Sequence, residues 1–532
     1  MRKFLLLIAA VLFSLGTYAQ KVLWNSSIDD VSAGEKFNVK SPAAMDMDGN
    51  LYVTGTQREA FEFAGNEAAV LGVGAYIAKY NAEGAEQYVI NLHGSIDITA
   101  ITTDAEKNLY IAGINEGMSY ITGVEGVEGE YEKIGNDGEK GAFMAKYDAN
   151  GNLLAVKTYK AVLESLIDFG DGYIVYGDNM DFYIGALPTL SISKILVEGS
   201  KVYAQFDYTG DVTVNSDLKL TAKLLFVMGF AYKDAMSSSV LVFDTMLENP
   251  SNVATLAVAD VAPDGSVADV SATHDFEFVV EGEDVYVAAF AAGNVVLTTS
   301  AGNEAFDFVT DDNSPHIEEG AIIANVGKKT VKLSNELREG DHTFYNTIVG
   351  MEVKNGKIYL AGTFNNTCAF DNSKEAVGAS DVFVASIYAN ELIVDGVYTN
   401  ANDEGVTNKY CEKVSGVVFG NESVYVISGV VDMNGEAETV YNNYNVAYDG
   451  TVNVATEALS ATTVAYNDNA MALINCTGKT AVSVYSKYEF TSIESVAVET
   501  ENTVIYDLTG RRIEKITNAG IYIVNGNKVL VK

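Results

Sequence analysis

A short segment recurs along the whole chain, and this repeat constrains the fold more than any other feature of the sequence. Each copy has a polar turn, an apolar strand that contains a tyrosine, and then a small residue or glycine. Clear copies occupy residues 48–55, 106–113, 171–177, 198–204, 282–288, 355–362 and 420–429, and a more degenerate copy occupies 469–475. Such a repeat predicts that one structural unit is used many times in the molecule.

A second segment follows most copies after a gap of variable length. It is clearest at residues 75–84 and 142–151, and weaker versions lie at 226–231, 321–326 and 382–388. Each is a strand that ends in a polar turn, and Asx-Gly or Glu-Gly pairs between apolar runs indicate β-hairpins. Together the two segments predict about four short strands in each period, which is the make-up of a propeller blade.

The sequence therefore predicts an all-β fold, a β-propeller of seven blades with eight as the alternative, followed by a short C-terminal β tail. The 31 tyrosines and 23 phenylalanines favour strands, and the 47 glycines favour tight turns. The interval between the copies at 171–177 and 198–204 is short, so either a blade is abbreviated there or the first of these copies is not part of a blade. Residues 20–24 have no preceding blade, and we expect them to close the ring by pairing near residues 482–488.

The first two periods resemble the SBBP-type propeller repeat. The resemblance is carried by Asn-Leu-Tyr-Val-Thr-Gly at 50–55, Asn-Leu-Tyr-Ile-Ala-Gly at 108–113, and the hairpins at 75–84 and 142–151. It covers residues 41–160. The resemblance implies a seven-bladed propeller; members of this family share an architecture rather than a known activity, so it implies no functional residue.

The two ends of the chain carry patterns that are typical of export. Arg2 and Lys3 precede an apolar run at 4–15, and small residues at Thr17 and Ala19 suit a cleavage site, so 1–19 is predicted to be a signal peptide. The segments 504–513 and 520–532 resemble the C-terminal sorting tail of Bacteroidota exported proteins of the type IX class. The resemblance implies that 491–532 are an address for the sorting machinery; the alternative is a small β unit that packs on the propeller.

These patterns divide the chain into a signal peptide (1–19), a propeller (20–490) and a sorting-type tail (491–532). We expect an extracellular or outer-surface location, with the periplasm as the alternative, and no transmembrane segment. The formal net charge is −38, from 72 acidic and 34 basic residues. Because nucleic-acid and anionic membrane surfaces attract Lys and Arg, this charge argues against both as partners. The three cysteines are widely spaced and form no disulfide framework, so a small apolar core role is expected for each.

The sequence contains no pattern that supports catalysis. The four histidines, His93, His274, His316 and His342, have none of the usual zinc-ligand spacings. No Gly-x-Ser-x-Gly turn is accompanied by a histidine, and the glycine-rich stretch at 123–129 lacks the Lys and Ser/Thr of a phosphate-binding loop. We therefore expect no catalytic residues and no cofactor other than a cation.

One short run is a candidate calcium site. Asp46, Asp48 and Asn50 supply the hard oxygen ligands that calcium prefers, but the remainder of a calcium-binding loop is absent. The alternative interpretation is a hairpin turn that uses Asp and Asn for its backbone geometry. A second acidic cluster, at 311–313 with Glu318 and Glu319, is interpreted as a solvated loop.

Without a catalytic pattern, the favoured function is a non-catalytic propeller that binds an extracellular glycan or protein ligand. The ligand is expected at one mouth of the axial channel, on loops that include 233–263 and 291–315. Two alternatives remain: an extracellular glycan-active enzyme with carboxylates in the channel, and a structural component of the cell surface.

Overall fold

The structure is a computed structural model, and its description covers the following residues: 22–28, 42–68, 73–136, 139–162, 166–168, 173–176, 181–184, 188–222, 225–227, 230–232, 236–259, 272–308, 319–334, 346–365, 367–376, 380–399, 410–420, 423–432, 440–448, 452–454, 461–476, 480–486, 505–507, 512–513, 520–524 and 527–531. These residues form strands and turns, and no helix is found among them. Within the same residues no helix is long and apolar enough to cross a membrane. The chain divides into two compact units, 22–485 and 486–532 together with 1–21, and each is described by itself.

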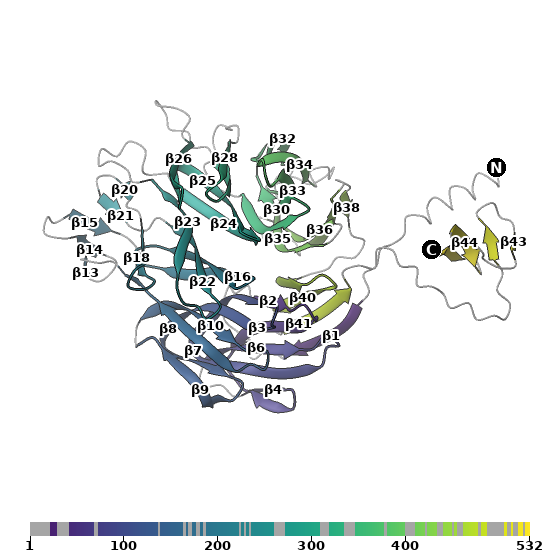
Figure 1. The fold of residues 1–532 in the computed structure, drawn as a ribbon, viewed down its shortest axis with the longest axis horizontal. Coiled ribbons are helices and arrows are strands. Elements are labelled where there is room, and N and C mark those ends of the chain that lie inside the picture. The colour runs from purple at the N-terminus through teal and green to yellow at the C-terminus, as the bar shows by residue number, and fades with distance from the viewer. Residues whose placement is uncertain are drawn as a thin grey trace. The chain divides into compact units, whose positions relative to one another are not determined.

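The first unit is a β-propeller, in which successive four-stranded antiparallel sheets form the blades (Figure 1). The strand pairings of the described residues give seven such sheets, here called blades I to VII. Blade I contains β2 (Ala43–Met45), β3 (Leu51–Gln57), β6 (Gly74–Tyr80) and the first part of β7 (Glu86–Thr103). Blade II contains the second part of β7, β8 (Leu109–Gly123), β10 (Lys140–Tyr147) and β11 (Leu153–Tyr159). Because the count covers only the described residues, the blade number of the whole chain stays a prediction.

The next blades follow the same order of strands. Blade III contains β16 (Leu190–Glu198), β17 (Lys201–Tyr208), β22 (Ser237–Asp244) and β23 (Ser251–Val258). Blade IV contains β24 (Ala272–Glu281), the first part of β25 (Asp284–Thr299), β27 (Glu319–Asn325) and β28 (Lys329–Ser334). Blade V contains β29 (Thr347–Lys354), β30 (Lys357–Phe364), β33 (Asp381–Tyr388) and β34 (Ile393–Thr399). Blade VI contains β35 (Tyr410–Phe419), β36 (Ser423–Asp432), β37 (Val440–Ala447) and β38 (Val452–Val454).

Blade VII is built from both ends of the propeller sequence. Its strands are β39 (Thr463–Tyr466), β40 (Ala470–Cys476), β41 (Thr480–Ser486) and, as the outer strand, β1 (Val22–Ile28). β1 runs antiparallel to β41, with Trp24 opposite Val484 and Ile28 opposite Thr480 (Figure 1). The expected closure of the ring through the N-terminal strand is therefore confirmed. Closure pairs strand edges that would otherwise be open to solvent or to another chain.

Additional strands lie between the blade strands. Seven of them form hairpins or short pairs between the second and third strands of a blade: β4 (Phe61–Phe63), β5 (Asn66–Ala68), β9 (Gly126–Ile134), β18 (Asp211–Thr213), β19 (Lys219–Thr221), β31 (Thr367–Cys368) and β32 (Asp371–Glu375). β26 (Gly302–Phe308) extends blade IV in the same position by pairing with the second part of β25. A further strand, β12 (Ala161–Val162), pairs with β18. A separate sheet contains β13 (Leu166–Asp168), β14 (Tyr173–Tyr176), β15 (Asp181–Ile184), β21 (Phe230–Tyr232) and β20 (Leu225–Val227).

The insertions give the propeller two different faces. Because neighbouring strands run in opposite directions, the connections between second and third strands share one face with the connections between blades. We call this the loop face. The connections between first and second strands, and between third and fourth strands, lie at the opposite end; they are short, as at Asp46–Asn50 and Asn81–Ala85, and we call this the turn face.

The repeat correctly located the second strand of every described blade. The tyrosine copies at 48–55, 106–113, 198–204, 282–288, 355–362 and 420–429 include the starts of β3, β8, β17, β25, β30 and β36, and the degenerate copy at 469–475 includes the start of β40. The copy at 171–177 is the exception, because β14 pairs with β13 and β15 outside the blades. Of the two alternatives given for this interval, the one that places the copy outside a blade is confirmed. The prediction that the weak hairpin copy at 226–231 belongs to a blade is wrong. Its strands, β20 and β21, belong to the separate sheet that also contains β13, β14 and β15.

One predicted ligand-binding loop is also wrong. The segment 233–263 contains β22 and β23, which are the third and fourth strands of blade III. Ser238 and Ser239 in β22 are buried and their hydroxyl groups have partners: Ser238 donates to Asp207, and Ser239 shares a hydrogen bond with Thr255. Hydrogen bonding within the blade thus offsets the cost of burying them.

Hydrophobic clusters fill the space between neighbouring blades. All seven residues of β6 are buried, which shows why its sequence, with Lys79 among apolar residues, does not alternate. The cluster between blades VII and I includes Ile28, Val53 and Ala472, and so spans the closure of the ring. Cys368 is buried in the cluster of blades IV and V, as expected for an apolar role, and neither Cys368 nor Cys476 is in a disulfide.

The second unit contains a four-stranded sheet. Its strands are β42 (Ile505–Asp507), β43 (Arg512–Ile513), β44 (Gly520–Val524) and β45 (Asn527–Val531), in the order β43-β42-β44-β45. The segments that resemble a sorting tail therefore form a sheet of their own. Their role as an address, the signal peptide and the division at residues 20 and 491 stay predictions.

Candidate functional site

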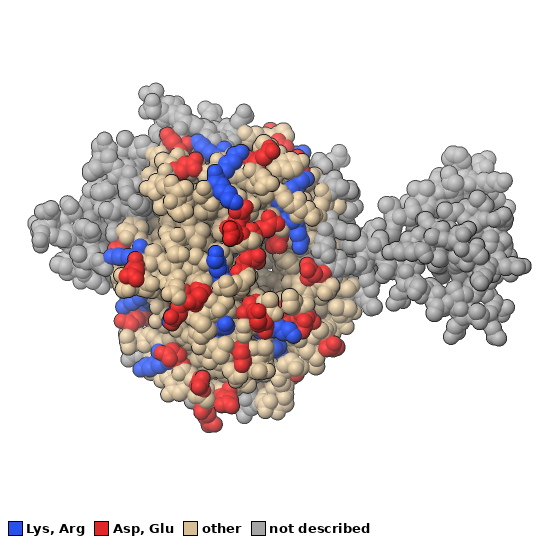
Figure 2. Space-filling view, viewed as in Figure 1, with Lys and Arg blue, Asp and Glu red and all other residues tan. Residues whose placement is uncertain are grey.

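A cavity of about 480 Å³ lies on the axis of the propeller, and we call it the axial cavity. Its lining includes residues from the first strand of each of the seven blades, among them Met45, Thr103, Phe419 and Tyr466. These four residues immediately precede turns at the turn face, so the cavity extends to that end of the channel. Figure 2 shows acidic side chains, with a few basic ones among them, gathered around the centre of the view.

An ion pair joins two blades in this cavity. Lys194 comes from β16 in blade III and Glu277 from β24 in blade IV, and Lys194 Nζ lies 2.7 Å from Glu277 Oε2. Lys194 Nζ also lies 5.3 Å from the centre of the Phe278 ring. The two side chains are only 26% and 21% exposed, so their mutual attraction is screened less than that of a surface pair. The pair places a fixed donor and a fixed acceptor in the cavity wall.

Two further polar groups of the cavity interact electrostatically. Burial, followed by the charge of Glu352, raises the pKa of Tyr466 well above its ordinary value. The Tyr466 phenol is therefore neutral over the physiological range and keeps its hydroxyl proton for donation. Tyr466 belongs to blade VII and Glu352 to blade V. Together with Lys194 of blade III and Glu277 of blade IV, polar groups from four blades therefore line the axial cavity. The remaining wall is largely apolar and includes Leu196, Val279 and Met351.

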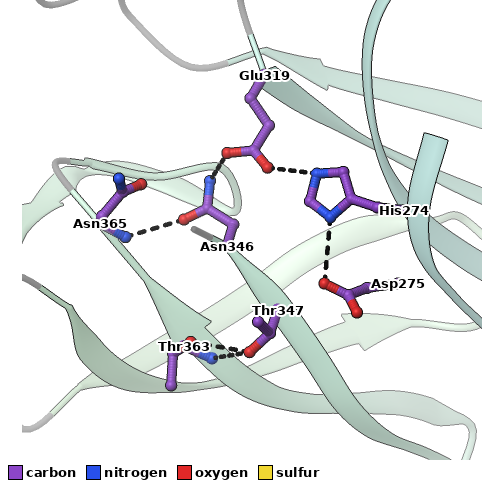
Figure 3. Close-up of polar contacts among 7 residues, drawn as sticks. All are labelled: His274, Asp275, Glu319, Asn346, Thr347, Thr363 and Asn365. Carbon is purple, nitrogen blue, oxygen red and sulfur yellow. Dashed lines mark hydrogen bonds and ion pairs between the residues drawn. The ribbon is translucent and has the colours of Figure 1, made fainter. Parts of the chain in front are cut away.

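A second polar cluster lies at the loop face between blades IV and V (Figure 3). His274, at the start of β24, lies between two carboxylates: its Nδ1 is 3.2 Å from Asp275 Oδ2 and its Nε2 is 2.7 Å from Glu319 Oε1. Asp275 has a φ of 49°, a conformation that few non-glycine residues adopt, and it lies in a bulge of β24. Asn346 donates to the other oxygen of Glu319 and accepts a hydrogen bond of 2.9 Å from the Asn365 backbone.

The charges of this cluster determine what it can do. Burial by itself would lower the pKa of His274, but the hydrogen bonds and charges of Asp275 and Glu319 outweigh burial and raise it to about 9. Burial raises the pKa of Glu319, and His274 opposes that shift. As an imidazolium whose two nitrogens both face carboxylates, His274 is not placed to accept a proton from a substrate. The cluster thus connects blades IV and V.

Sequence reasoning missed this cluster. Glu319 was interpreted as part of a solvated loop, which is wrong: it begins β27 and its side chain is only 10% exposed. No spacing could have joined it to His274, because the two lie on strands separated by β25 and its insertion. Of the other histidines, His93 is buried in β7, and burial lowers its pKa. His316, His342, residues 311–313 and Glu318 lie outside the described residues.

The candidate calcium ligands lie in the turn that connects β2 to β3. Asp46 Oδ1 accepts hydrogen bonds from the Asp48 and Asn50 backbone amides at 3.0 and 2.9 Å, and Asp46 Oδ2 accepts one from Asn50 Nδ2 at 2.7 Å. The Asp48 carboxylate forms an ion pair with Lys107 of the next blade. This geometry supports the hairpin-turn interpretation. Across the described residues, no group of three or more His, Cys, Asp or Glu side chains is arranged to hold a metal ion. Calcium binding at Asp46, Asp48 and Asn50 stays a prediction.

Comparisons with known proteins add little to this picture. No protein-family model matches the chain, and no curated protein matches its sequence. Solved structures that it resembles include the Dos1 propeller, with 10% identity, 88% of this chain and 95% of the other covered, and a TM-score of 0.34. An α-L-arabinofuranosidase of Fusarium graminearum in complex with arabinobiose has 10% identity, coverage of 73% and 92%, and a TM-score of 0.32. A protein of unknown function from Bacteroides caccae has 10% identity, coverage of 69% and 83%, and a TM-score of 0.25.

These similarities are too low to carry an argument about function. The blade pairings and the axial cavity of this chain define its class: it is a β-propeller with a cavity on its axis.

Proposed function

We propose that this protein is an exported, non-catalytic β-propeller that binds an extracellular ligand, a neutral saccharide, in the axial cavity. The observation that carries the proposal is the convergence of polar groups from four blades on one cavity with an otherwise largely apolar wall. Its volume lies within the range of roughly 300–1,000 Å³ that is usual for small-ligand sites. Hydroxyl groups of a sugar require fixed donors and acceptors, and its C–H faces require apolar contacts.

The compensated charges of the Lys194–Glu277 pair favour a ligand without charge beside it. Lys194 and Glu277 compensate each other at 2.7 Å, and Tyr466 is held neutral by burial. An ionic ligand would have to compete with the existing pair, whereas a hydroxyl group can donate to Glu277 and accept from Lys194 without breaking it.

A glycan-active enzyme is the second candidate, and one observation favours it. Glu277 and Glu352 lie on the first strands of adjacent blades and line the same cavity. Glycoside hydrolysis commonly uses two carboxyl groups, one as proton donor and one as base or nucleophile. In this cavity Glu277 already has a lysine partner, which suits a positioning role better than proton transfer. A structural surface component is the third interpretation and predicts no saccharide binding.

The location outside the cell rests on the two ends of the chain. A signal peptide at 1–19 and a sorting-type tail at 491–532 support export and delivery to the outer surface. Fractionation of the native host, with full-length protein and a variant lacking 491–532, tests this. Retention of both proteins in the same outer fraction would argue against a sorting role for the tail.

A saccharide and peptide panel, followed by calorimetry on each hit, tests the proposed ligand class. Ala43→Phe, which fills the axial cavity, and Glu352→Gln should each weaken saccharide binding by about tenfold or more. Glu283→Gln, on an exposed turn outside the cavity, is the matched control and should bind normally. Unchanged binding by both cavity variants, or a response to peptides alone, would contradict the proposal. Release of reducing sugar that is lost in Glu277→Gln and Glu352→Gln would identify the enzyme instead.

A further inference from the structure

A separate cavity of about 290 Å³ lies at the loop face between blades II and III. One wall comes from the second part of β7, from β8 and from the start of β10, and includes Asp97, Glu116 and Lys140. The opposite wall comes from residues 188–190 and from Ala161 in β12. We call this cavity the Asp97 pocket. It shares no lining residue with the axial cavity.

The walls of the Asp97 pocket are fixed by hydrogen bonds. The Thr189 backbone amide donates to Thr209 Oγ1 at 2.9 Å, and the Thr209 amide donates to the Thr189 carbonyl oxygen at 3.0 Å. Ala161 pairs with Val212 in the β12–β18 ladder. On the other side, Thr99 Oγ1 donates to the Ile192 carbonyl oxygen at 2.5 Å and joins the two blades. The pocket is therefore preformed, which lowers the ordering cost of binding.

The charges around the pocket leave one carboxylate without a cation. Lys140 Nζ lies 3.6 Å from Glu116 Oε1, and Lys160 Nζ lies 2.9 Å from Glu139 Oε1. Among the residues described, Asp97 has no hydrogen-bond donor or ion-pair partner for its carboxylate. The pKa shifts are consistent with this difference in pairing. The hydrogen bond from Lys160 is the main cause that lowers the pKa of Glu139, whereas burial alone raises the pKa of Asp97.

We propose that the Asp97 pocket binds a small organic cation, a primary ammonium group on a short apolar stem. The ammonium group would compensate the Asp97 carboxylate with a charge-assisted hydrogen bond. Ile114, Pro188 and Leu190 supply the apolar surface for the stem. The net charge of −38 attracts cations to the protein in general, but only a partly buried, uncompensated carboxylate can select one at a defined position. The ammonium group can belong to a free amine or to a lysine side chain of a peptide.

Calorimetry at physiological ionic strength tests this with two probes, n-butylammonium chloride and N-acetyl-lysine methylamide. We expect binding at one site, a loss of about tenfold or more in Asp97→Asn, and no binding of n-butanol, which has the same stem without the charge. Glu139→Gln, whose pair with Lys160 lies outside the pocket lining, is the matched control and should bind normally. Binding of both probes would indicate a lysine side chain as ligand, and binding of butylammonium alone a free amine.

A second variant separates the carboxylate from the cavity. Ala161→Phe should abolish binding by filling the pocket while Asp97 remains in place. Binding by the wild type should also weaken as the pH falls through the raised pKa of Asp97, because the protonated acid no longer compensates a cation. Equal binding of n-butanol, unchanged binding by Asp97→Asn, or an equal loss in Glu139→Gln would overturn the proposal, the last by indicating general counter-ion attraction.

Discussion

At the turn face the strands of each blade are joined by turns of a few residues, whereas at the loop face the chain inserts further hairpins between the same strands. The acidic residues of the two faces differ accordingly. At the turn face, Asp46, Asp104 and Asp148 accept hydrogen bonds from the amides of their own turns. At the loop face, Glu319 faces His274, and Asp97 faces a cavity.

The turn face also carries several contacts that connect neighbouring blades. Lys79 Nζ donates to the Ala149 carbonyl oxygen at 2.8 Å, which connects blade I to blade II. Across the closure of the ring, Asn467 Nδ2 donates to the Asp46 carbonyl oxygen at 2.8 Å, and Trp24 Nε1 donates to the Ala82 carbonyl oxygen at 3.0 Å. The comparison indicates that Asp46, Asp104 and Asp148 stabilise the turns of the turn face, whereas at the loop face Glu319 joins two blades and Asp97, which has no cation partner among the described residues, faces a cavity.

The largest expected effect concerns the closure at the turn face. Deleting residues 20–27 removes most of β1, leaves the edge of β41 unpaired and removes Trp24 from the ring of Tyr80 and the turn at Gly84. We expect a loss of at least about 3 kcal/mol in the free energy of unfolding, measured by urea titration. Deleting 491–532 should leave the propeller transition unchanged. Equal free energies of unfolding for the two deletion variants would show that the closure contributes little to stability.

A smaller effect is expected at two turns in which an Asp accepts hydrogen bonds from the backbone amide and the side chain of the Asn four residues later, but which differ in burial. Asp104 is only 8% exposed and also accepts a hydrogen bond of 3.1 Å from the Tyr110 hydroxyl, whereas Asp148 makes its three turn bonds at a more exposed position. Asp104→Ala should cost about 2–3 kcal/mol, because buried donors lose their acceptor, and Asp148→Ala about 1 kcal/mol. Chemical denaturation of both variants measures the difference. Similar losses would mean that burial of the turn is unimportant.

At the loop face, the His274 cluster should make stability depend on pH. The pKa of His274 in the folded protein, about 9, lies above the ordinary value of 6.5. Its contribution is therefore complete below the ordinary value and is lost as the pH rises through about 9. Relative to His274→Gln, the wild type should lose about 1–2 kcal/mol between about pH 7 and pH 10. Parallel pH profiles for the two proteins would contradict the assigned charge state.

The sequence predicts the turn face better than the loop face, for a physical reason. A turn that is capped by its own Asp, as at Asp46 and Asn50, needs residues that are close in sequence, so the repeat reveals it. The same local signals located β40 despite its degenerate copy. The closure by β1 could also be predicted. The N-terminal strand has no preceding blade to complete, so in a closed ring it is expected to pair with the last blade.

Features of the loop face depend on residues that are far apart in the chain. His274 and Glu319 meet only because β24 and β27 flank β25 in one sheet. Asp97 meets Leu190 only where two blades are neighbours. Ser238 and Ser239, in the segment predicted to be a loop, have their partners, Asp207 and Thr255, on neighbouring strands. Contacts of this kind join residues that are far apart in the chain, so no fixed spacing in the sequence predicts them.

The smallest expected effect is that of calcium, and it tests the assigned role of the turn-face acids directly. Asp46 already accepts three hydrogen bonds, and Asp48 is paired with Lys107. A calcium ion could bind the carboxylate oxygens of Asp46 and Asp48 only by displacing these hydrogen-bond donors and Lys107. Ligand binding stabilises a fold only in proportion to the excess of ligand over its dissociation constant. We therefore expect calcium or EDTA to shift the melting temperature by no more than about 2–3 °C. Asp48→Asn serves as the control, because it leaves the Asp46 cap intact and should respond to calcium as the wild type does. A large drop with EDTA that calcium restores, and that Asp48→Asn abolishes, would instead establish Asp46, Asp48 and Asn50 as a metal site and remove the distinction between the two faces.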